Sequence, residues 1–251
     1  MARIALVGGT GAGALVPADA QEQEATSAWG SPSGNLHRWW RAGSEFLFLP
    51  RHGLPPRVPP HRVNFRANVD VLAGLAPDLV IGINAVGGIA PHCSPGRLVV
   101  PDQLIDYTWG RDATYFDGGG ETPVHVEFEP PFAPAARDAL LAAAARAGVT
   151  VVPGGTYGVT QGPRLETAAE IARLARDGCD VVGMTAMPEA ALARERGLAY
   201  AILCVVVNPA AGLAPPGRGM LAGLSDALAA GLRDVSRVLD ALVAGDGFRA
   251  G

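Results

Sequence analysis

The sequence contains no lysine: all 20 of its basic residues are arginines. This absence excludes a P-loop nucleotide site, which needs a lysine on the phosphates, and any enzyme that forms a Schiff base through a lysine amine. An anion bound by this chain must be held by arginine, histidine, hydroxyl groups, backbone N–H groups or a metal. The net charge of −4 gives no electrostatic reason to expect a nucleic-acid partner.

Cysteine is scarce as well, with three widely separated residues and no C-x-x-C pair: Cys93, Cys179 and Cys204. This pattern predicts reduced thiols rather than disulfides or a zinc site. The apolar runs have the length of strands, well short of the roughly 20 residues of a membrane span, and no signal-peptide pattern follows Met1. We therefore expect a cytoplasmic protein with no membrane partner.

The composition that remains is that of a globular protein, 49% hydrophobic and 18% charged over 251 residues. Apolar runs of strand length alternate with segments of helical spacing. This alternation predicts a single α/β domain with a mostly parallel, twisted central sheet flanked by helices. We expect the domain to cover residues 1–245, with a frayed tail at 246–251.

The expected strands cover residues 4–7, 45–49, 79–85, 98–105, 149–152, 181–184 and 200–207. The expected helices cover residues 64–75, 134–147, 167–177, 188–196 and 221–243. Residues 17–44 are polar and are expected to form a meander of short elements, and the proline-rich stretch 55–60 is expected to be an extended loop. In such folds ligands bind at the carboxyl ends of strands.

Glu166 and Asn208, a carboxylate and a carboxamide expected at strand ends, form a pair suited to reading opposite edges of a flat, polar heterocycle. A carboxylate accepts a ring N–H. A carboxamide both donates and accepts, so it can hold a carbonyl oxygen and a neighbouring ring nitrogen. The pair therefore predicts recognition of a base.

Several other groups at strand ends predict a bound phosphate. The glycine turn Gly8–Gly13, which includes Thr10, offers backbone N–H groups, and the turn Asn84–Gly88 offers more. Arg51 and His52 add a guanidinium that matches phosphate bidentately and a titratable imidazole. Thr185 lies just before a helix N-terminus, which attracts anions.

Each motif also has a simpler interpretation when taken alone. The first glycine turn is either structural, an anion nest, or part of a dinucleotide site in which Arg51 contacts the 2′-phosphate of NADP. Met184 is either core or a platform under a sugar. Asp102 and Asp106 resemble a metal pair but fit strand ends and turns, so no metal site is expected.

Together the motifs resemble the trimeric purine nucleoside phosphorylase and methylthioadenosine phosphorylase family over nearly the whole chain. The resemblance is carried, in family order, by Gly8–Gly11, Arg51–Gly53, Val63–Asn68, Asn84–Gly88, Gln161–Arg164 and Gly183–Glu189. It implies a single α/β domain assembled as a homotrimer, with active sites near subunit boundaries. It also implies a small-molecule nucleoside substrate, inorganic phosphate as co-substrate, and no metal or organic cofactor.

The resemblance also implies roles for individual residues. Phosphate ligands fall on Thr10, Arg51, His52, Asn84, Ala85 (through its backbone) and Thr185. Ribose and base contacts fall on Met184, Leu165, Glu166, Asn208 and Ala210. The 5′ end of the substrate is expected to contact Leu221, Leu224 and His125, and this histidine comes from a neighbouring subunit. Catalysis is expected to depend on Asn208, Glu166 and His52.

Departures within the family narrow the expected substrate. The 6-aminopurine enzymes have a serine at the position of Glu166 and Asp-x-Asp at the position of Asn208 to Ala210, whereas 6-oxopurine enzymes have Glu and Asn. A 6-oxopurine offers an N1–H to Glu166 and O6 to Asn208, but a 6-aminopurine turns an N1 lone pair toward the carboxylate. Leu165 replaces an aromatic found beside the base in many relatives.

The 5′ end is the second discriminator, because the histidine that holds the 5′-hydroxyl in ordinary inosine and guanosine phosphorylases is missing. Leu221 and Leu224 stand in its segment and either form an apolar pocket or simply pack the helix. The expected reaction is phosphorolysis of a 6-oxopurine nucleoside with a 5′-methylthio group, releasing hypoxanthine. Methylthioadenosine phosphorylase, a general inosine and guanosine phosphorylase, and an NADP-dependent reductase or nucleotide-binding module remain alternatives.

Overall fold

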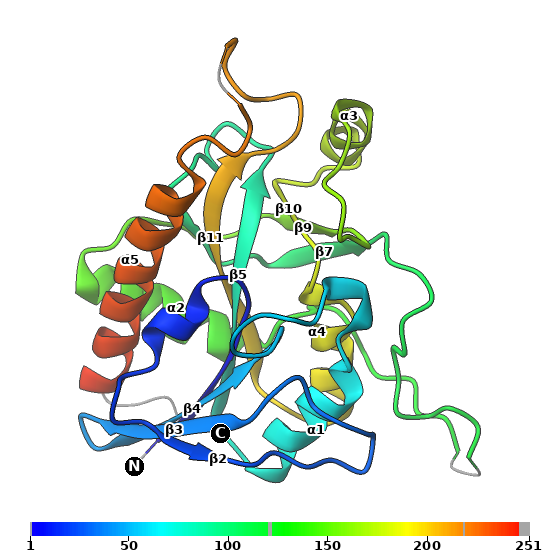
Figure 1. Cartoon of the computed structure of the whole chain (residues 1–251), viewed down its shortest axis with the longest axis vertical. Helices are drawn as coiled ribbons and strands as arrows, with labels where there is room; N and C mark the ends of the chain where they lie inside the picture. Colours follow the sequence, from blue (N-terminus) through cyan, green and yellow to red (C-terminus); the bar gives the residue numbers. More distant parts are fainter. Residues whose placement is uncertain (1, 120–121, 218, 246–251) are drawn as a thin grey trace.

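Two long parallel strands, β5 (Leu79–Gly88) and β11 (Tyr200–Pro209), lie side by side at the centre of the molecule (Figure 1). The computed structural model describes residues 2–119, 122–217 and 219–245. The other strands are β1 (Arg3–Gly8), β2 (Gln21–Gln23), β3 (Leu36–Arg41), β4 (Ser44–Pro50), β6 (Leu98–Val99), β7 (Gln103–Asp106), β8 (Val151–Val152), β9 (Thr156–Val159) and β10 (Val181–Gly183). Six of the ten pairings between described strands are parallel and four are antiparallel, so the sheet is mixed.

Helices cover both faces of this sheet, which confirms the predicted α/β class (Figure 1). On one face lie α2 (Pro134–Ala147) and α5 (Leu224–Ala244), and on the other lie α1 (Phe65–Gly74) and α4 (Ala186–Glu195). Each face of the sheet forms a hydrophobic core with its helices, and alternate residues of a strand contribute to the two cores. In β4, Phe46 packs toward α2 and α5, and Leu47 packs toward α1 and α4. α3 (Ala168–Arg176) packs separately near β10.

One edge of β5 changes partners in the middle of the strand. β1 pairs with it as far as Ile83, and β10 pairs with it only from Gly87 onward. Along its other edge β5 pairs with β11 throughout. The backbone of residues 84–86 is therefore outside the ladder on one side, and a polar ligand can approach it there.

The helix ends follow signals that are visible in the sequence. α2 has the predicted bounds, and Gly148 ends it with a left-handed φ of 62°. Asn64 caps α1 by accepting a hydrogen bond from the N–H of Ala67. Thr167 and Glu170 form a capping box at the start of α3. These local rules explain why the helices could be predicted.

The structure corrects several details of the prediction. The single strand expected over 98–105 is two strands, β6 and β7, because Pro101 lacks an N–H and cannot continue a ladder. The short, glycine-containing β9 was not predicted, and α5 begins at Leu224 rather than at Leu221. The expected tail at 246–251 lies outside the described residues, so the domain boundary stays a prediction.

In the described part of the chain, none of the helices combines the length and apolar character needed to cross a membrane.

Candidate active site

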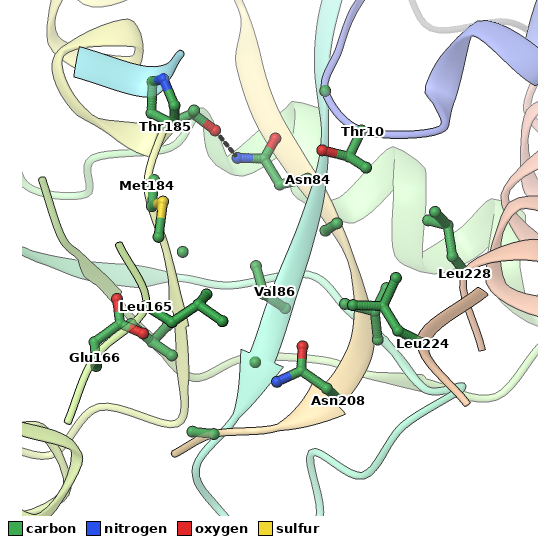
Figure 2. Close-up of a pocket in the computed structure, with 18 of the residues that line it drawn as sticks. Thr10, Asn84, Val86, Leu165, Glu166, Met184, Thr185, Asn208, Leu224 and Leu228 are labelled. Carbon is green, nitrogen blue, oxygen red and sulfur yellow. Dashed lines mark hydrogen bonds between the residues drawn. The ribbon is translucent and has the colours of Figure 1, made fainter. Parts of the chain in front are cut away.

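A cavity of about 200 Å³ opens where one edge of β5 is unpaired (Figure 2). Its lining comes from the ends of β1, β4, β5, β10 and β11, from the loop before α3, and from α5 and the segment leading into it. The sequence-predicted residues that line it are Thr10, Arg51, His52, Asn84, Ala85, Leu165, Glu166, Met184, Thr185, Asn208, Ala210, Leu221 and Leu224. His125 is exposed and does not line the cavity of its own chain.

The residues predicted to contact phosphate and those predicted to contact the base lie at different ends of the cavity. Figure 2 shows Thr10, Asn84 and Thr185 at one end, and Glu166 and Asn208 toward the other. Met184 lies between the two ends. Leucines of α5 form a separate wall. We refer to the two ends as the phosphate end and the base end.

Arg51 at the phosphate end departs from the expected geometry. It is fully buried, and its Nε and Nη2 already donate to the carboxylate of Glu189 at 2.7 and 2.8 Å. Nη2 also lies 3.0 Å from the carbonyl oxygen of Val7, and Nη1 donates to Ile83 at 3.3 Å. The expected bidentate grip on phosphate is not available in this arrangement. Nη1, which carries a second N–H, lies beside Gly9 in the cavity wall.

The charge of Arg51 is matched inside the protein. Burial alone would lower the pKa of Arg51, but the adjacent Glu189 carboxylate outweighs that effect and raises it. Tyr200 donates its hydroxyl hydrogen to Glu189 Oε1 at 2.7 Å, which satisfies the carboxylate further. Because the pair is neutral as a unit, the phosphate end carries less free positive charge than the sequence suggests.

Asn84 links this ion pair to Thr185. Its Oδ1 accepts from Arg51 at 3.1 Å, and its Nδ2 donates to Thr185 Oγ1 at 3.0 Å (Figure 2). Nδ2 also lies 3.3 Å from the Tyr157 hydroxyl. Because the Thr185 oxygen accepts from Asn84, its own hydrogen is free to be donated elsewhere. The network thus leaves the Thr185 hydroxyl at the cavity wall as a hydrogen-bond donor for a ligand.

His52 is held in one tautomer. Its Nδ1 lies 2.8 Å from the carbonyl oxygen of Val58, which can only accept, so Nδ1 carries the hydrogen. Burial, and then the neighbouring Arg51, lower the pKa of His52 below its usual value. The ring is therefore neutral near pH 7, and its Nε2 is a hydrogen-bond acceptor. Such a nitrogen suits the protonated oxygen of a hydrogen phosphate.

The backbone groups of the phosphate end are only partly available. The N–H of Gly9 donates to Ile83 at 3.1 Å, so the expected nest cannot use it. Ala85, in contrast, lies in the unpaired stretch of β5, opposite neither β1 nor β10. The unpaired edge therefore offers its main chain to an oxyanion.

At the base end, Glu166 is oriented by a neighbour. Thr160 Oγ1 donates to Glu166 Oε1 at 2.6 Å, which leaves Oε2 as a free acceptor. Gly162 adopts a left-handed φ of 61°, and a side chain there would collide with Met184 Sδ. Glycine at this position lets the loop with Glu166 lie directly on Met184.

Asn208 owes its direction to a bulge in β11. The pairing register with β5 shifts between Val206 and Asn208, so Val207 is an extra residue. Val207 and Asn208 consequently both line the cavity, although neighbours in a regular strand point to opposite faces. One N–H of the Asn208 amide donates to the carbonyl of Pro209 at 2.7 Å, which leaves a second N–H and the oxygen for a ligand.

The wall of the cavity near α5 is apolar. Met220, Leu221, Leu224 and Leu228 line it, and Leu221 is 54% exposed at the mouth. Gly11 lies against this wall, because a side chain there would meet Leu228 at 2.7 Å. The wall offers apolar packing to a ligand.

The residues with competing interpretations have structural roles. Asp102 accepts from the N–H of Gly155 at 2.8 Å, and Asp106 accepts from the N–H of Thr108 at 2.8 Å. Within the described residues no cluster of His, Cys, Asp or Glu could hold a metal ion. The first glycine turn leads into a short 3-10 helix, η1 (Ala12–Leu15), rather than the long helix of a dinucleotide site, and Arg51 is already paired.

Several contributors were missed from the sequence: Thr160, Arg111, Tyr157, Tyr200 and Glu189. Glu189 gave a signal, because an acid stands in an otherwise apolar stretch that the resemblance already marked. Tyr157 and Arg111 gave none, since their partners are far away in the chain or are backbone atoms. Thr160 and Tyr200 have side-chain partners only 6 and 11 residues away, Glu166 and Glu189, but no known motif links the residues of either pair.

Comparison with known proteins shows that this chain is similar to phosphorylases over most of its length. The model of the phosphorylase superfamily matches residues 3–244. A probable S-methyl-5′-thioinosine phosphorylase from Xanthomonas campestris pv. campestris is 51% identical over 83% of this chain and 84% of that protein. The 6-oxopurine nucleoside phosphorylase of Pyrococcus furiosus is 41% identical over 85% of this chain and 82% of that protein.

A solved structure agrees with the sequence matches. The Q289L mutant of adenosine/methylthioadenosine phosphorylase from Schistosoma mansoni, in complex with tubercidin, superimposes with a TM-score of 0.89 at 27% identity. The alignment covers 97% of this chain and 91% of that protein.

Proposed function

The chain belongs to the phosphorylase superfamily, and we propose that it cleaves the N-glycosidic bond of S-methyl-5′-thioinosine with inorganic phosphate. The products are hypoxanthine and 5-methylthioribose 1-phosphate. The observation that carries the proposal is one cavity with Glu166 and Asn208 at its base end and an apolar leucine wall beside it. The relatives named for the same reaction support this assignment.

The choice of base is set by the hydrogen-bonding atoms of Glu166 and Asn208 that have no partner among the described residues. Oε2 of Glu166 accepts the N1–H of hypoxanthine, and the free N–H of Asn208 donates to O6 or N7 as negative charge develops on the departing purine. A 6-aminopurine has no N1–H and would leave the carboxylate unpaired. Sites built this way can reject the wrong partner by factors of about 10⁴.

Phosphate is proposed to lie beneath C1′ of the sugar. The hydroxyls of Thr10 and Thr185 and the main chain of Ala85 hold its oxygens, and Nη1 of Arg51 supplies one more N–H. His52 Nε2 accepts the phosphate hydrogen. A phosphate oxygen bonds to C1′ as the C1′–N9 bond breaks, and the electron pair of the C1′–N9 bond leaves with the purine. The purine anion then gains one proton, equal to the one that the phosphate gives up, and becomes hypoxanthine.

Positioning and electrostatics carry most of this catalysis. The phosphate stabilises an oxocarbenium-like sugar from one side, and Asn208 stabilises the leaving group from the other. The reaction needs no metal or organic cofactor. Met184 supplies an apolar surface beneath the ribose.

We also propose a homotrimer in which His125 serves a neighbouring subunit. The exposure of His125, away from the cavity of its own chain, supports that arrangement. The three free, buried cysteines support a reducing, cytoplasmic compartment. Light scattering tests the trimer, and a His125→Ala variant that keeps the full affinity for nucleoside contradicts the role of His125.

One assay tests the function. Base release is measured from inosine, adenosine and their 5′-methylthio forms, each with and without phosphate. We expect release to depend on phosphate and kcat/KM to be highest for S-methyl-5′-thioinosine. An equal or greater value for methylthioadenosine overturns the base assignment, and equal turnover of inosine favours a general 6-oxopurine phosphorylase, the activity of the P. furiosus relative.

A further inference from the structure

The guanidinium of Arg111 bridges two segments that line different parts of the cavity. Its Nη1 donates to the carbonyl oxygens of Met184 at 2.9 Å and Met187 at 2.6 Å. Its Nη2 donates to those of Thr160 at 3.3 Å and Gln161 at 2.9 Å. Its Nε donates to the side-chain oxygen of Gln161 at 3.1 Å. All five N–H groups of a guanidinium are thereby matched to oxygen acceptors.

The bridged segments carry the groups that hold substrate. The segment that starts at Thr160 carries Glu166, which Thr160 also orients through its hydroxyl. The segment that starts at Met184 carries the ribose platform and Thr185. Arg111 itself does not line the cavity.

The sheet alone does not hold these segments together. β9 and β10 pair in parallel up to Val159 and Gly183, and the N–H of Thr160 donates to Gly183 at 2.8 Å. Beyond that point the two segments are no longer paired in the sheet. Arg111 binds them at the place where the backbone pairing stops.

The site of the guanidinium favours a fixed geometry. Burial lowers the pKa of Arg111, and Asp106 offsets part of this effect. The ring of Phe65 lies 5.5 Å from its central carbon, on the face that makes no hydrogen bonds. A lysine has three donors on one nitrogen and cannot reach five oxygens in this planar arrangement.

We propose that Arg111 is a positioning residue that sets the distance between the base reader Glu166 and the ribose and phosphate contacts at Met184 and Thr185. This inference rests on the proposed function. When the guanidinium is lost, each ligand still meets its own segment, but C1′ is no longer aligned with the phosphate. A displacement of about 1 Å can cost roughly 100-fold in rate.

The test compares Arg111→Ala and Arg111→Lys with the matched variants of Arg137. Arg137 also donates to backbone carbonyls, those of Pro101, Val100 and Pro153, but it lies outside the cavity. Steady-state kinetics are measured for nucleoside and phosphate separately, at temperatures where unfolding scans show every variant folded.

We expect kcat to fall about 100-fold in Arg111→Ala and about 10-fold or more in Arg111→Lys, with smaller changes in either KM. The Arg137 variants should keep kcat within about threefold of wild type. Added guanidinium ion at low concentration should restore part of the activity of Arg111→Ala and none in Arg137→Ala. An Arg111→Lys protein with unchanged kcat, or a loss seen only in melting temperature, overturns the proposal.

Failure of the proposed function gives a different result. In that case wild type itself shows no phosphate-dependent cleavage. Binding of S-methyl-5′-thioinosine, which would contact both segments at once, is then measured by calorimetry in place of turnover, and Arg111→Ala should still weaken it about tenfold more than Arg137→Ala does. Equal binding by the two variants overturns the role of Arg111 independently.

Discussion

The two ends of the cavity are built in different ways. At the phosphate end Arg51, Asn84 and Glu189 are at most 1% exposed and form one connected hydrogen-bond network. Leu165, beside the base end, is 44% exposed and Leu221, in the apolar wall, is 54% exposed, and both stand outside helices and strands. The phosphate end is fixed by the core, whereas the base end combines Asn208 of strand β11 with the loop that carries Leu165 and Glu166.

This difference matches the division of labour in the proposed reaction. Phosphate is common to every phosphorylase, so donors held in a fixed, water-poor frame serve it without reorganisation. The base and the 5′ group distinguish one nucleoside from another, and loops vary in sequence more readily than core residues do. The contrast between a rigid end and a variable end leads to four predictions.

The largest effect is expected from Glu189→Gln, which leaves the buried charge of Arg51 without its partner. Removal of one member of a buried ion pair typically costs about 3–5 kcal/mol in the free energy of unfolding. Urea titration measures the loss. Asp240→Asn is the control, because its exposed pair with Arg41 should contribute less than about 1 kcal/mol. Similar losses in both variants would refute the idea of a rigid phosphate end.

A smaller effect, on activity rather than stability, is expected from Glu166→Gln. A hydrogen bond to a charged group contributes about 1.5–3 kcal/mol, which corresponds to roughly 10- to 100-fold in kcat/KM for the 6-oxo nucleoside. Because the amide can also donate to N1 of an adenine, the preference for 6-oxo substrates should narrow.

The kinetics of this variant are measured on S-methyl-5′-thioinosine and methylthioadenosine in parallel. Glu170→Gln serves as the control, since Glu170 pairs with Arg164 and does not line the cavity. Unchanged selectivity in Glu166→Gln would mean that the carboxylate does not read the base.

A smaller effect, on substrate preference, is expected from Leu221→Ser. The polar side chain replaces part of the apolar wall, so the preference for a 5′-methylthio over a 5′-hydroxyl group should fall about tenfold, the usual scale for one small apolar group in a pocket. The ratio of kcat/KM for S-methyl-5′-thioinosine and inosine measures it. Leu213→Ser, at a position that is 48% exposed and lies outside the lining, should leave the ratio unchanged.

The smallest effect concerns pH and His52. Its pKa is lowered in the folded protein by burial and by Arg51, so below about pH 6.5 the unfolded chain binds the proton more readily. The stability that neutral His52 contributes to the folded protein is present above that pH. It is lost as the pH falls through the lowered pKa of His52. Unfolding free energies at pH 7.5 and 5.5 should differ less in His52→Gln than in wild type. An equal difference would contradict a neutral, partly buried imidazole.

Local signals made much of the fold predictable. The bounds of α2 follow from an alanine-rich run between Pro134 and Gly148, and the caps at Asn64 and Thr167 follow from side chains that bond nearby N–H groups. Strand ends also placed the predicted ligands in one cavity, since parallel strands bring their carboxyl ends together.

What the sequence hid depends on long-range geometry. The partner of Arg51 is Glu189, 138 residues away. Nothing in the sequence near Arg51 shows that its guanidinium already donates to a carboxylate. The acceptors of Arg111 are mostly backbone carbonyls, which every residue has and no pattern can mark. The partner change along β5 likewise depends on where β1 and β10 end in space.

That partner change has a lasting consequence for how such a protein can diversify. The opening beside residues 84–86 exists because one strand serves two neighbours in succession, so it is a product of topology and not of any side chain. Loops around it can be exchanged for others that admit a different purine or sugar substituent, and the aperture itself survives each exchange. Evolution can thus rewrite the selectivity of this scaffold without having to invent its pocket again.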